Sequence, residues 1–159
     1  MNGLLIRPYR MGDAKPLGKL FHNAVRYGAK DHYTRRQRMA WSPKPRAGQL
    51  WATELYSPNV DTFVAEWGGR AVGFMTLAPE TGHLDFAYVA PNLRGAGVAN
   101  ALYHMIEGRA RTVGLRRLET EASHMAERFF LRRGWHLLAR QEVVRNGIKI
   151  PNARMEKYL

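Results

Sequence analysis

The sequence contains no cysteine. Disulfides, thiolate metal sites and cysteine nucleophiles all require that residue, so its absence excludes disulfide-stabilised scaffolds and several classes of enzyme. Long apolar runs are missing as well, and we therefore expect no membrane-spanning helix. The segment from Met1 to Arg7 lacks the apolar stretch and the small-residue cleavage site of a signal peptide. We accordingly expect a cytoplasmic protein that does not act at a membrane.

Acidic residues are scarce relative to basic ones. The chain of 159 residues carries 25 Lys and Arg against 13 Asp and Glu, a formal net charge of +12 at pH 7. Such a charge concentrates anions around the protein, which favours either nucleic acid or a phosphate-rich cofactor as a partner. The basic residues are scattered rather than gathered in one tail, and this disfavours nucleic acid. Length and a 45% hydrophobic composition predict one domain over residues 1–159.

The hydrophobic periodicity predicts a mixed α/β fold in the order β-α-α-β-β-β-α-β-α-β-β. Asp13 is expected to cap the first helix, and Ser123 the last. Between the first helix and the second strand, residues 33–51 should form a broken helical segment, because Ser42 and two prolines interrupt it. The expected strands cover residues 4–8, 62–66, 71–77, 83–89, 115–121, 135–145 and 148–158, and a long helix covers 98–113.

Two hairpins and one crossover connect these strands. The first hairpin turns at residues 67–70 and the second at Asn146-Gly147, a pair typical of type I′ turns. A β-α-β crossover of the observed length implies that the strand at 115–121 lies parallel to the strand at 83–89. The fold class therefore combines antiparallel hairpins with one parallel pair.

A glycine-rich turn between a strand and a long helix is the most informative segment. Unpaired backbone N–H groups and the positive end of the helix dipole converge at such a turn and create an anion site. Gly95 and Gly97 allow a phosphate to approach the backbone, and Arg94 adds a charge-assisted donor. The alternative interpretation is a tight loop that merely requires glycine.

The pattern Arg94-x-x-Gly97-x-Ala99 resembles the pyrophosphate-binding signature Gln/Arg-x-x-Gly-x-Gly/Ala of the GNAT acetyltransferases. Further segments similar to that family occur in its order and cover nearly the whole chain: Ile6-Arg7-Pro8, Val64-Ala65-Glu66, Val72-Gly73-Phe74, Tyr88-Val89-Ala90-Pro91 and residues 126–135. The resemblance implies the GNAT fold and acetyl transfer from acetyl-CoA to the primary amine of a small molecule or peptide, by direct attack in a ternary complex. Dinucleotide binding is less favoured, because Asn100 replaces the third glycine of that fingerprint.

The resemblance also implies which residues hold the cofactor. In GNAT folds the strands that correspond to 83–89 and 115–121 splay apart, and the pantetheine arm lies between them against the backbone of Ala87 and Val89. Ser123 would reach the cofactor near its thiol, although its role as a helix cap is an equally good interpretation. The pyrophosphate would be held by Arg94, Gly95, Ala96, Gly97, Val98 and Ala99.

Catalysis requires a base, because an amine at pH 7 is mostly protonated. His83 and Asp85 share one face of their strand by alternation, and we favour Asp85 because it lies deeper in the strand. The family's usual general acid, a tyrosine, is replaced here by Phe130. Either Tyr88 or water would then protonate the thiolate, and Tyr88 is equally well interpreted as a core aromatic.

The acceptor pocket should be formed by the helical segment after residue 30. Tyr33, Gln37, Trp41 and Trp51 could line it, although aromatic residues on an amphipathic helix usually belong to the core. A cationic protein repels polyamines and basic peptides at long range, so neutral or acidic amines are favoured.

His104 and Glu107 share a helix face without a third ligand, so we expect no metal site. A catalytically silent acyl-CoA-binding sensor stays as the first alternative function, and a basic nucleic-acid-binding protein as the second. The sequence leaves open whether the protein forms a homodimer.

Overall fold

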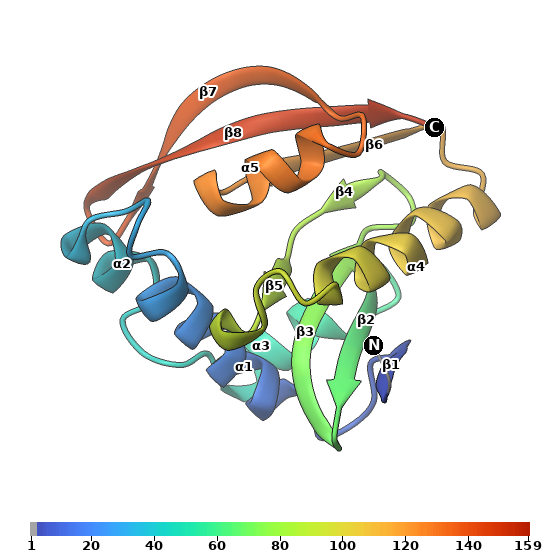
Figure 1. The fold of residues 1–159 in the computed structure, drawn as a ribbon, viewed down its shortest axis with the longest axis horizontal. Helices are drawn as coiled ribbons and strands as arrows, with labels where there is room; N and C mark the ends of the chain where they lie inside the picture. The colour runs from blue at the N-terminus through green and yellow to red at the C-terminus, as the bar shows by residue number, and fades with distance from the viewer. Residues whose placement is uncertain (1–2) are drawn as a thin grey trace.

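The computed structural model describes residues 3–159, which form two sheets with helices around them (Figure 1). The first sheet has the strand order β1-β2-β3-β5, and all its neighbouring strands are antiparallel. The predicted hairpin at residues 67–70 is confirmed: Trp67 pairs with Arg70, and Gly68 and Gly69 both have positive φ. The strands are β1 (Leu4–Pro8), β2 (Asp61–Trp67), β3 (Arg70–Leu77) and β5 (Ala87–Val89).

The second sheet has the order β4-β6-β8-β7. The pairing of β4 with β6 is parallel, which confirms the predicted crossover, and the other pairs are antiparallel. The predicted type I′ turn is also confirmed, because Asn146 and Gly147 have φ values of 48° and 78°. The strands are β4 (His83–Leu84), β6 (Arg117–Ala122), β7 (His136–Arg145) and β8 (Ile148–Tyr158).

The prediction of one continuous strand over residues 83–89 is wrong. The segment is divided into β4 and β5, which belong to different sheets. Phe86 stays attached to the first sheet, since its N–H donates to Thr76 Oγ1 and its carbonyl accepts from Thr76 N, both at 3.0 Å. Leu84 is held by the second sheet, where its carbonyl accepts from Thr120 Oγ1 at 2.8 Å. The two sheets therefore diverge at Asp85, and Figure 1 shows β4 and β5 leading from one sheet to the other.

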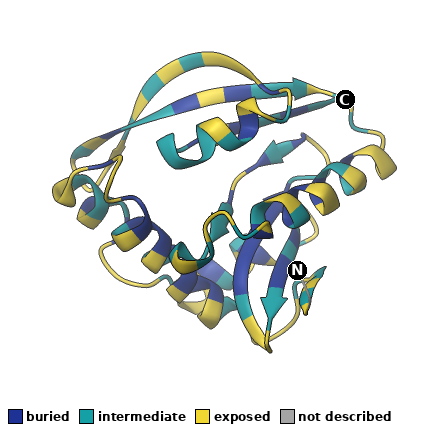
Figure 2. Ribbon diagram, viewed as in Figure 1, coloured by how far each residue is buried: buried dark blue, intermediate teal, exposed yellow. Residues whose placement is uncertain are grey.

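Helices cover both faces of the first sheet. By strand alternation Val64 and Phe74 pack against the N-terminal helices, whereas Ala65 and Met75 pack against the long helix α4. Figure 2 shows the resulting buried residues concentrated where helices meet strands. The helices are α1 (Ala14–Asn23), continued by a π-helical turn at Ala24–Gly28, then α2 (Arg35–Trp41), α3 (Gly48–Leu55), α4 (Val98–Thr112) and α5 (His124–Leu131).

Two helix caps differ in outcome. Ser123 caps α5 as predicted, because its side chain accepts from Ala126 N at 3.3 Å. Asp13 occupies the N-cap position of α1 as predicted, but its side chain makes no capping bond. Its carboxylate instead accepts from Arg10 N and from both terminal nitrogens of Arg7 at 2.8 to 2.9 Å. Burial opposes ionisation of Asp13, but the Arg7 hydrogen bonds lower its pKa below the ordinary value.

Candidate active site

The glycine-rich turn adopts a conformation that requires glycine. Gly95 and Gly97 have φ values of +81° and +89°, in the left-handed region that L side chains rarely adopt. Gly97 occupies the N-cap of α4, so the turn lies at the positive end of a helix of 15 residues. The Ala96 N–H donates to Leu93 O at 3.1 Å and closes the turn. Within residues 3–159, no backbone or side-chain acceptor bonds the N–H groups of Gly95, Gly97, Val98, Ala99 and Asn100.

These free N–H groups define an anion site at the start of α4. Ala96 was expected to contribute its N–H to the same site, but that group is used inside the turn, and Ala96 does not line the neighbouring cavity. Arg94 does line the cavity, and its guanidinium donates to the carbonyl of Gly28 at the end of the π-helical turn.

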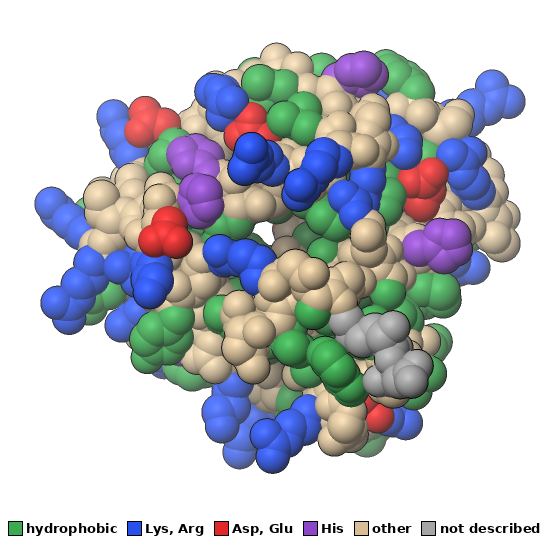
Figure 3. Space-filling model, viewed as in Figure 1, with side chains coloured by type: hydrophobic (Ala, Val, Ile, Leu, Met, Phe, Trp, Pro, Cys, Tyr) green, Lys and Arg blue, Asp and Glu red, His purple; other side chains and the backbone are tan. Residues whose placement is uncertain are grey.

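A cavity of about 750 Å³ lies beside the turn, and we call it the glycine-turn cavity. It extends between the turn, β5 and α5, and the face of the molecule in Figure 3 is hollowed at its centre, with Lys and Arg side chains around the hollow. Phe130, which replaces the expected tyrosine, lines this cavity and is 1% exposed. Four arginines line it together with the turn: Arg94, Arg128, Arg132 and Arg133.

The free edge of β5 forms one wall of the glycine-turn cavity. β5 is the last strand of its sheet, and Phe86, just before it, directs its carbonyl toward Thr76 of β3. Because backbone groups alternate in direction along an antiparallel strand, Ala87 and Val89 direct their N–H and C=O groups toward the opposite edge. Both residues line the cavity, so an extended ligand there could pair with the strand.

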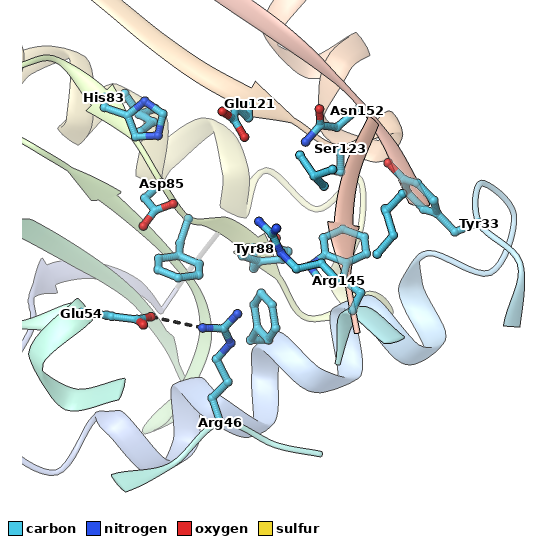
Figure 4. A pocket seen from close by; sticks show the side chains of 16 residues that line it. Tyr33, Arg46, Glu54, His83, Asp85, Tyr88, Glu121, Ser123, Arg145 and Asn152 are labelled. Atoms are coloured by element: carbon cyan, nitrogen blue, oxygen red, sulfur yellow. Dashed lines mark hydrogen bonds and ion pairs between the residues drawn. The ribbon is translucent and has the colours of Figure 1, made fainter. Parts of the chain in front are cut away.

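A second cavity of about 370 Å³ lies on the other side of Tyr88, and we call it the mixed-charge cavity (Figure 4). Tyr88 and Ser123 line both cavities, so they mark the place where the two meet. The cavity wall is made by Phe21, Tyr33, Trp41, Arg46, Glu54, His83, Leu84, Asp85, Phe86, Tyr88, Glu121, Ser123, Val143, Arg145, Ile150 and Asn152.

Tyr88 combines packing with exposure to both cavities. Its ring packs edge-on against Phe21, with centroids 4.7 Å apart, and lies 5.9 Å from Phe74. Burial raises the pKa of its hydroxyl well above the ordinary value, although the charges of Arg46 and Arg145 act in the opposite direction. The hydroxyl therefore stays protonated at neutral pH and can donate.

Both predicted bases, His83 and Asp85, line the mixed-charge cavity. The structure does not support the reason for preferring Asp85, which was its greater depth in the strand. Asp85 lies beyond the end of β4 in the break between the sheets and is exposed, so it does not lie deeper than His83. Its carboxylate points into the cavity in Figure 4. His83 lies at the start of β4, with Nδ1 3.7 Å from Glu119 Oε1.

The residues expected to line an acceptor pocket are divided. Tyr33 and Trp41 line the mixed-charge cavity, although the Tyr33 hydroxyl is already saturated: it donates to Pro151 O at 2.7 Å and accepts from His124 N at 3.0 Å.

Gln37 and Trp51 do not line the mixed-charge cavity. Gln37 forms a capping box with Thr34, which satisfies backbone N–H groups at the start of α2. Its amide nitrogen also donates to Lys149 O. Trp51 is 2% exposed in the core, where its indole N–H donates to Ala14 O at 2.8 Å.

Several charged and polar residues of the mixed-charge cavity were missed by the sequence analysis. Arg46 lies between α2 and α3, pairs with Glu54 at 3.2 Å and stacks 4.8 Å above the Phe21 ring. Glu121, Arg145 and Asn152 come from β6, β7 and β8. They lie far apart in the chain, and no local motif relates them.

Comparison with known proteins identifies the family. The model of the acetyltransferase (GNAT) domain matches residues 29–159. YafP, an uncharacterized N-acetyltransferase of Escherichia coli (strain K12), is 30% identical over 156 residues, which cover 98% of this chain and 96% of the relative.

Solved structures agree with this match. A GCN5-related N-acetyltransferase from Rhodopseudomonas palustris superposes with a TM-score of 0.91 at 31% identity, covering 100% of this chain and 98% of the other. PaiA N-acetyltransferase from Thermoplasma acidophilum, solved in complex with coenzyme A, has a TM-score of 0.76 at 13% identity, covering 98% of this chain and 99% of the other. The latter likeness concerns the fold.

The chain therefore belongs to the GNAT family of N-acetyltransferases. It is an enzyme that transfers an acetyl group from acetyl-CoA, its cosubstrate. Across residues 3–159, no helix has both the length and the apolar composition needed to cross a membrane.

Proposed function

We propose that the glycine-turn cavity binds acetyl-CoA and that the mixed-charge cavity binds the primary amine of a small molecule or peptide. The observation that carries this assignment is that the two cavities meet at Tyr88 and Ser123. A thioester at that junction would be accessible to an amine from the other side. Transfer would then occur directly within a ternary complex.

The fit of the glycine-turn cavity to coenzyme A rests on three features of the chain. The free N–H groups from Gly95 to Ala99, apart from that of Ala96, are suited to a pyrophosphate at the helix N-terminus. The arginines that line the cavity supply countercharge, Arg94 among them. Ala87 and Val89 present free backbone groups with which an amide-containing pantetheine arm can pair.

The chemistry assigns a proton transfer to each side of the junction. When bound, acetyl-CoA supplies the acetyl group as a thioester. Asp85, directly or through water, accepts a proton from the ammonium group of the acceptor, and His83 is the alternative base. The free amine nitrogen forms a bond to the acetyl carbon while the carbon–sulfur bond breaks, and Tyr88 donates a proton to the departing sulfur. The acetylated nitrogen then loses its second proton, which returns through water to the Tyr88 oxygen, and Asp85 releases its proton to solvent. The products are the N-acetylated acceptor and coenzyme A.

Ser123 has a positioning role in this scheme. Its Oγ accepts the Ala126 N–H as the cap of α5, which leaves its hydroxyl proton free to donate toward the junction. The cap and the contact with the cofactor are therefore compatible.

Release of free thiol from acetyl-CoA, measured against a panel of amines, tests the assignment. Initial rates at varied concentrations of both substrates should give intersecting reciprocal plots, as a ternary complex requires. Parallel plots would indicate a covalent acetyl-enzyme and contradict direct attack. Tight binding of coenzyme A without turnover on any amine would instead support the silent sensor.

A further inference from the structure

The mixed-charge cavity separates its charges. Figure 4 shows Asp85, just after β4, and Glu121 of β6 facing the cavity. Arg46 and Arg145 reach into it from other elements. Arg46 already has a carboxylate partner, Glu54, at 3.2 Å. The cavity therefore presents acceptors for an ammonium group on one side and guanidinium donors on the other.

Arg145 is the cation with unused capacity. It is the last residue of β7, at the type I′ turn, and the only hydrogen bond of its side chain within residues 3–159 runs from Nη1 to the neighbouring Val144 O at 3.2 Å. No carboxylate within the same residues lies at ion-pair distance from it. Its guanidinium extends toward Tyr88, as Figure 4 shows, and can offer two parallel N–H donors to an oxyanion.

The carboxylates supply the complementary observation. Glu121 of β6 and Asp85 both line the cavity and face it in Figure 4. Neither carboxylate has an ion-pair partner within residues 3–159. An ammonium group of a ligand on this side of the cavity would supply the missing countercharge.

The remaining wall is apolar and limits the size of the ligand. Phe21, Trp41, Phe86, Val143 and Ile150 line the cavity, whose volume is about 370 Å³. That space suits one small molecule with an apolar or aromatic side group.

Taken together, the geometry points to an acceptor of amino-acid size that carries both a primary amine and a carboxylate. We propose that Arg145 binds the carboxylate and that Glu121 and Asp85 orient the amine toward the junction at Tyr88. Arg145 is thereby the residue that determines specificity for the acidic group. This inference rests on the proposed function, because it names the substrate class of the same cavity.

Calorimetry on the protein saturated with coenzyme A tests the inference without requiring turnover. The probes are L-phenylalanine and 3-amino-3-phenylpropionate, each compared with its carboxamide. We expect at least one acid to bind about tenfold or more tightly than its amide, since a charge-assisted pair is lost in the amide. In R145Q the preference should fall below about twofold, and R145K should retain part of it.

The matched control is K149Q, which removes one positive charge from the same hairpin at a residue that lies outside the cavity. It should preserve the preference for the acid. Equal binding of acid and amide in both pairs, an unchanged preference in R145Q, or the same loss in K149Q would each overturn the inference. Thiol release is recorded in the same mixtures with acetyl-CoA. If no probe is acetylated while the Arg145-dependent preference persists, the proposed transfer fails and the carboxylate site stands.

Discussion

Tyr88 lies where the two cavities meet, and in the proposed mechanism its hydroxyl donates the proton that Phe130 cannot supply. Replacement by phenylalanine keeps the packing against Phe21 and removes only the hydroxyl. We expect Y88F to lower kcat by about 10². The affinity for coenzyme A should stay within about twofold, because Tyr88 does not belong to the glycine turn.

The pH dependence of Tyr88 has a defined sign. Burial raises its pKa, so the hydroxyl stays protonated below its ordinary pKa of about 10, and the donor is lost only as the pH rises through the raised value. The wild-type kcat should therefore show no alkaline decline below about pH 10. A decline near neutral pH, or wild-type turnover in Y88F, would assign the proton donation to water or to another group.

Asp85 and His83 compete for the role of base, and paired variants separate them. D85N keeps the size of the side chain but cannot accept a proton, so we expect kcat to fall by roughly 10² to 10⁴ with coenzyme A affinity nearly unchanged. H83Q should retain most of the activity, because the imidazole of His83 faces Glu119 and not the acceptor in the proposed mechanism. If H83Q is inactive while D85N turns over normally, the two roles must be exchanged.

At the scale of elements, the decisive feature is the junction between the glycine turn and α4. Gly97→Glu introduces a side chain in a left-handed position and places a carboxylate among N–H groups that would bind pyrophosphate. We expect the variant to fold but to lose detectable binding of coenzyme A in calorimetry.

Gly114 provides the matched control for this variant. It has φ +82° just beyond the opposite end of α4, and a Cβ there meets nothing within 4 Å. Gly114→Glu therefore carries a similar backbone penalty of about 1 to 2 kcal/mol without entering the anion site. Coenzyme A affinity that survives in Gly97→Glu, or is lost equally in both variants, would contradict the assignment of the turn.

The break between β4 and β5 is the second feature at this scale. The same segment binds both sheets through threonine hydroxyls, Thr76 on one side and Thr120 on the other. Because each hydroxyl satisfies a backbone group that a continuous strand would have paired, the chain can change sheets without leaving those groups unsatisfied. The change of sheet leaves Asp85 facing the mixed-charge cavity.

For the whole molecule, we propose that residues 1–159 form one domain whose two sheets are joined further by the ligand. The glycine-turn cavity lies between β5 of the first sheet and α5, which packs against β6 and β8 of the second sheet. Coenzyme A bound there would contact both β5 and α5. At a concentration of 100 times Kd the ligand should stabilise the fold by about 2.7 kcal/mol. That corresponds to a rise in Tm of roughly 5 to 10 °C for a protein of this size.

Scanning calorimetry measures both parts of this prediction. One transition with equal calorimetric and van't Hoff enthalpies is expected with and without coenzyme A. Gly97→Glu should show the single transition but no shift with the ligand. Two separate transitions would mean that the sheets unfold as independent units and would contradict the single domain.

The sequence alone determined the features that depend on neighbouring residues. The hairpin at residues 67–70, the type I′ turn at Asn146-Gly147, the Ser123 cap and the glycine turn at the start of α4 follow from φ preferences and hydrogen bonds within a few residues. For the same reason the anion site could be located, apart from the N–H of Ala96.

Only the tertiary structure decided how the mixed-charge cavity is composed. Arg46, Glu121, Arg145 and Asn152 come from separate elements, and their proximity depends on strand register and on the divergence of the sheets. The same holds for Gln37, whose side chain has partners at the start of its own helix and on β8. Periodicity tells which face of an element is buried, but it carries no information about which distant side chain lies opposite. Packing between elements supplies that information, and the acceptor site is built from such contacts.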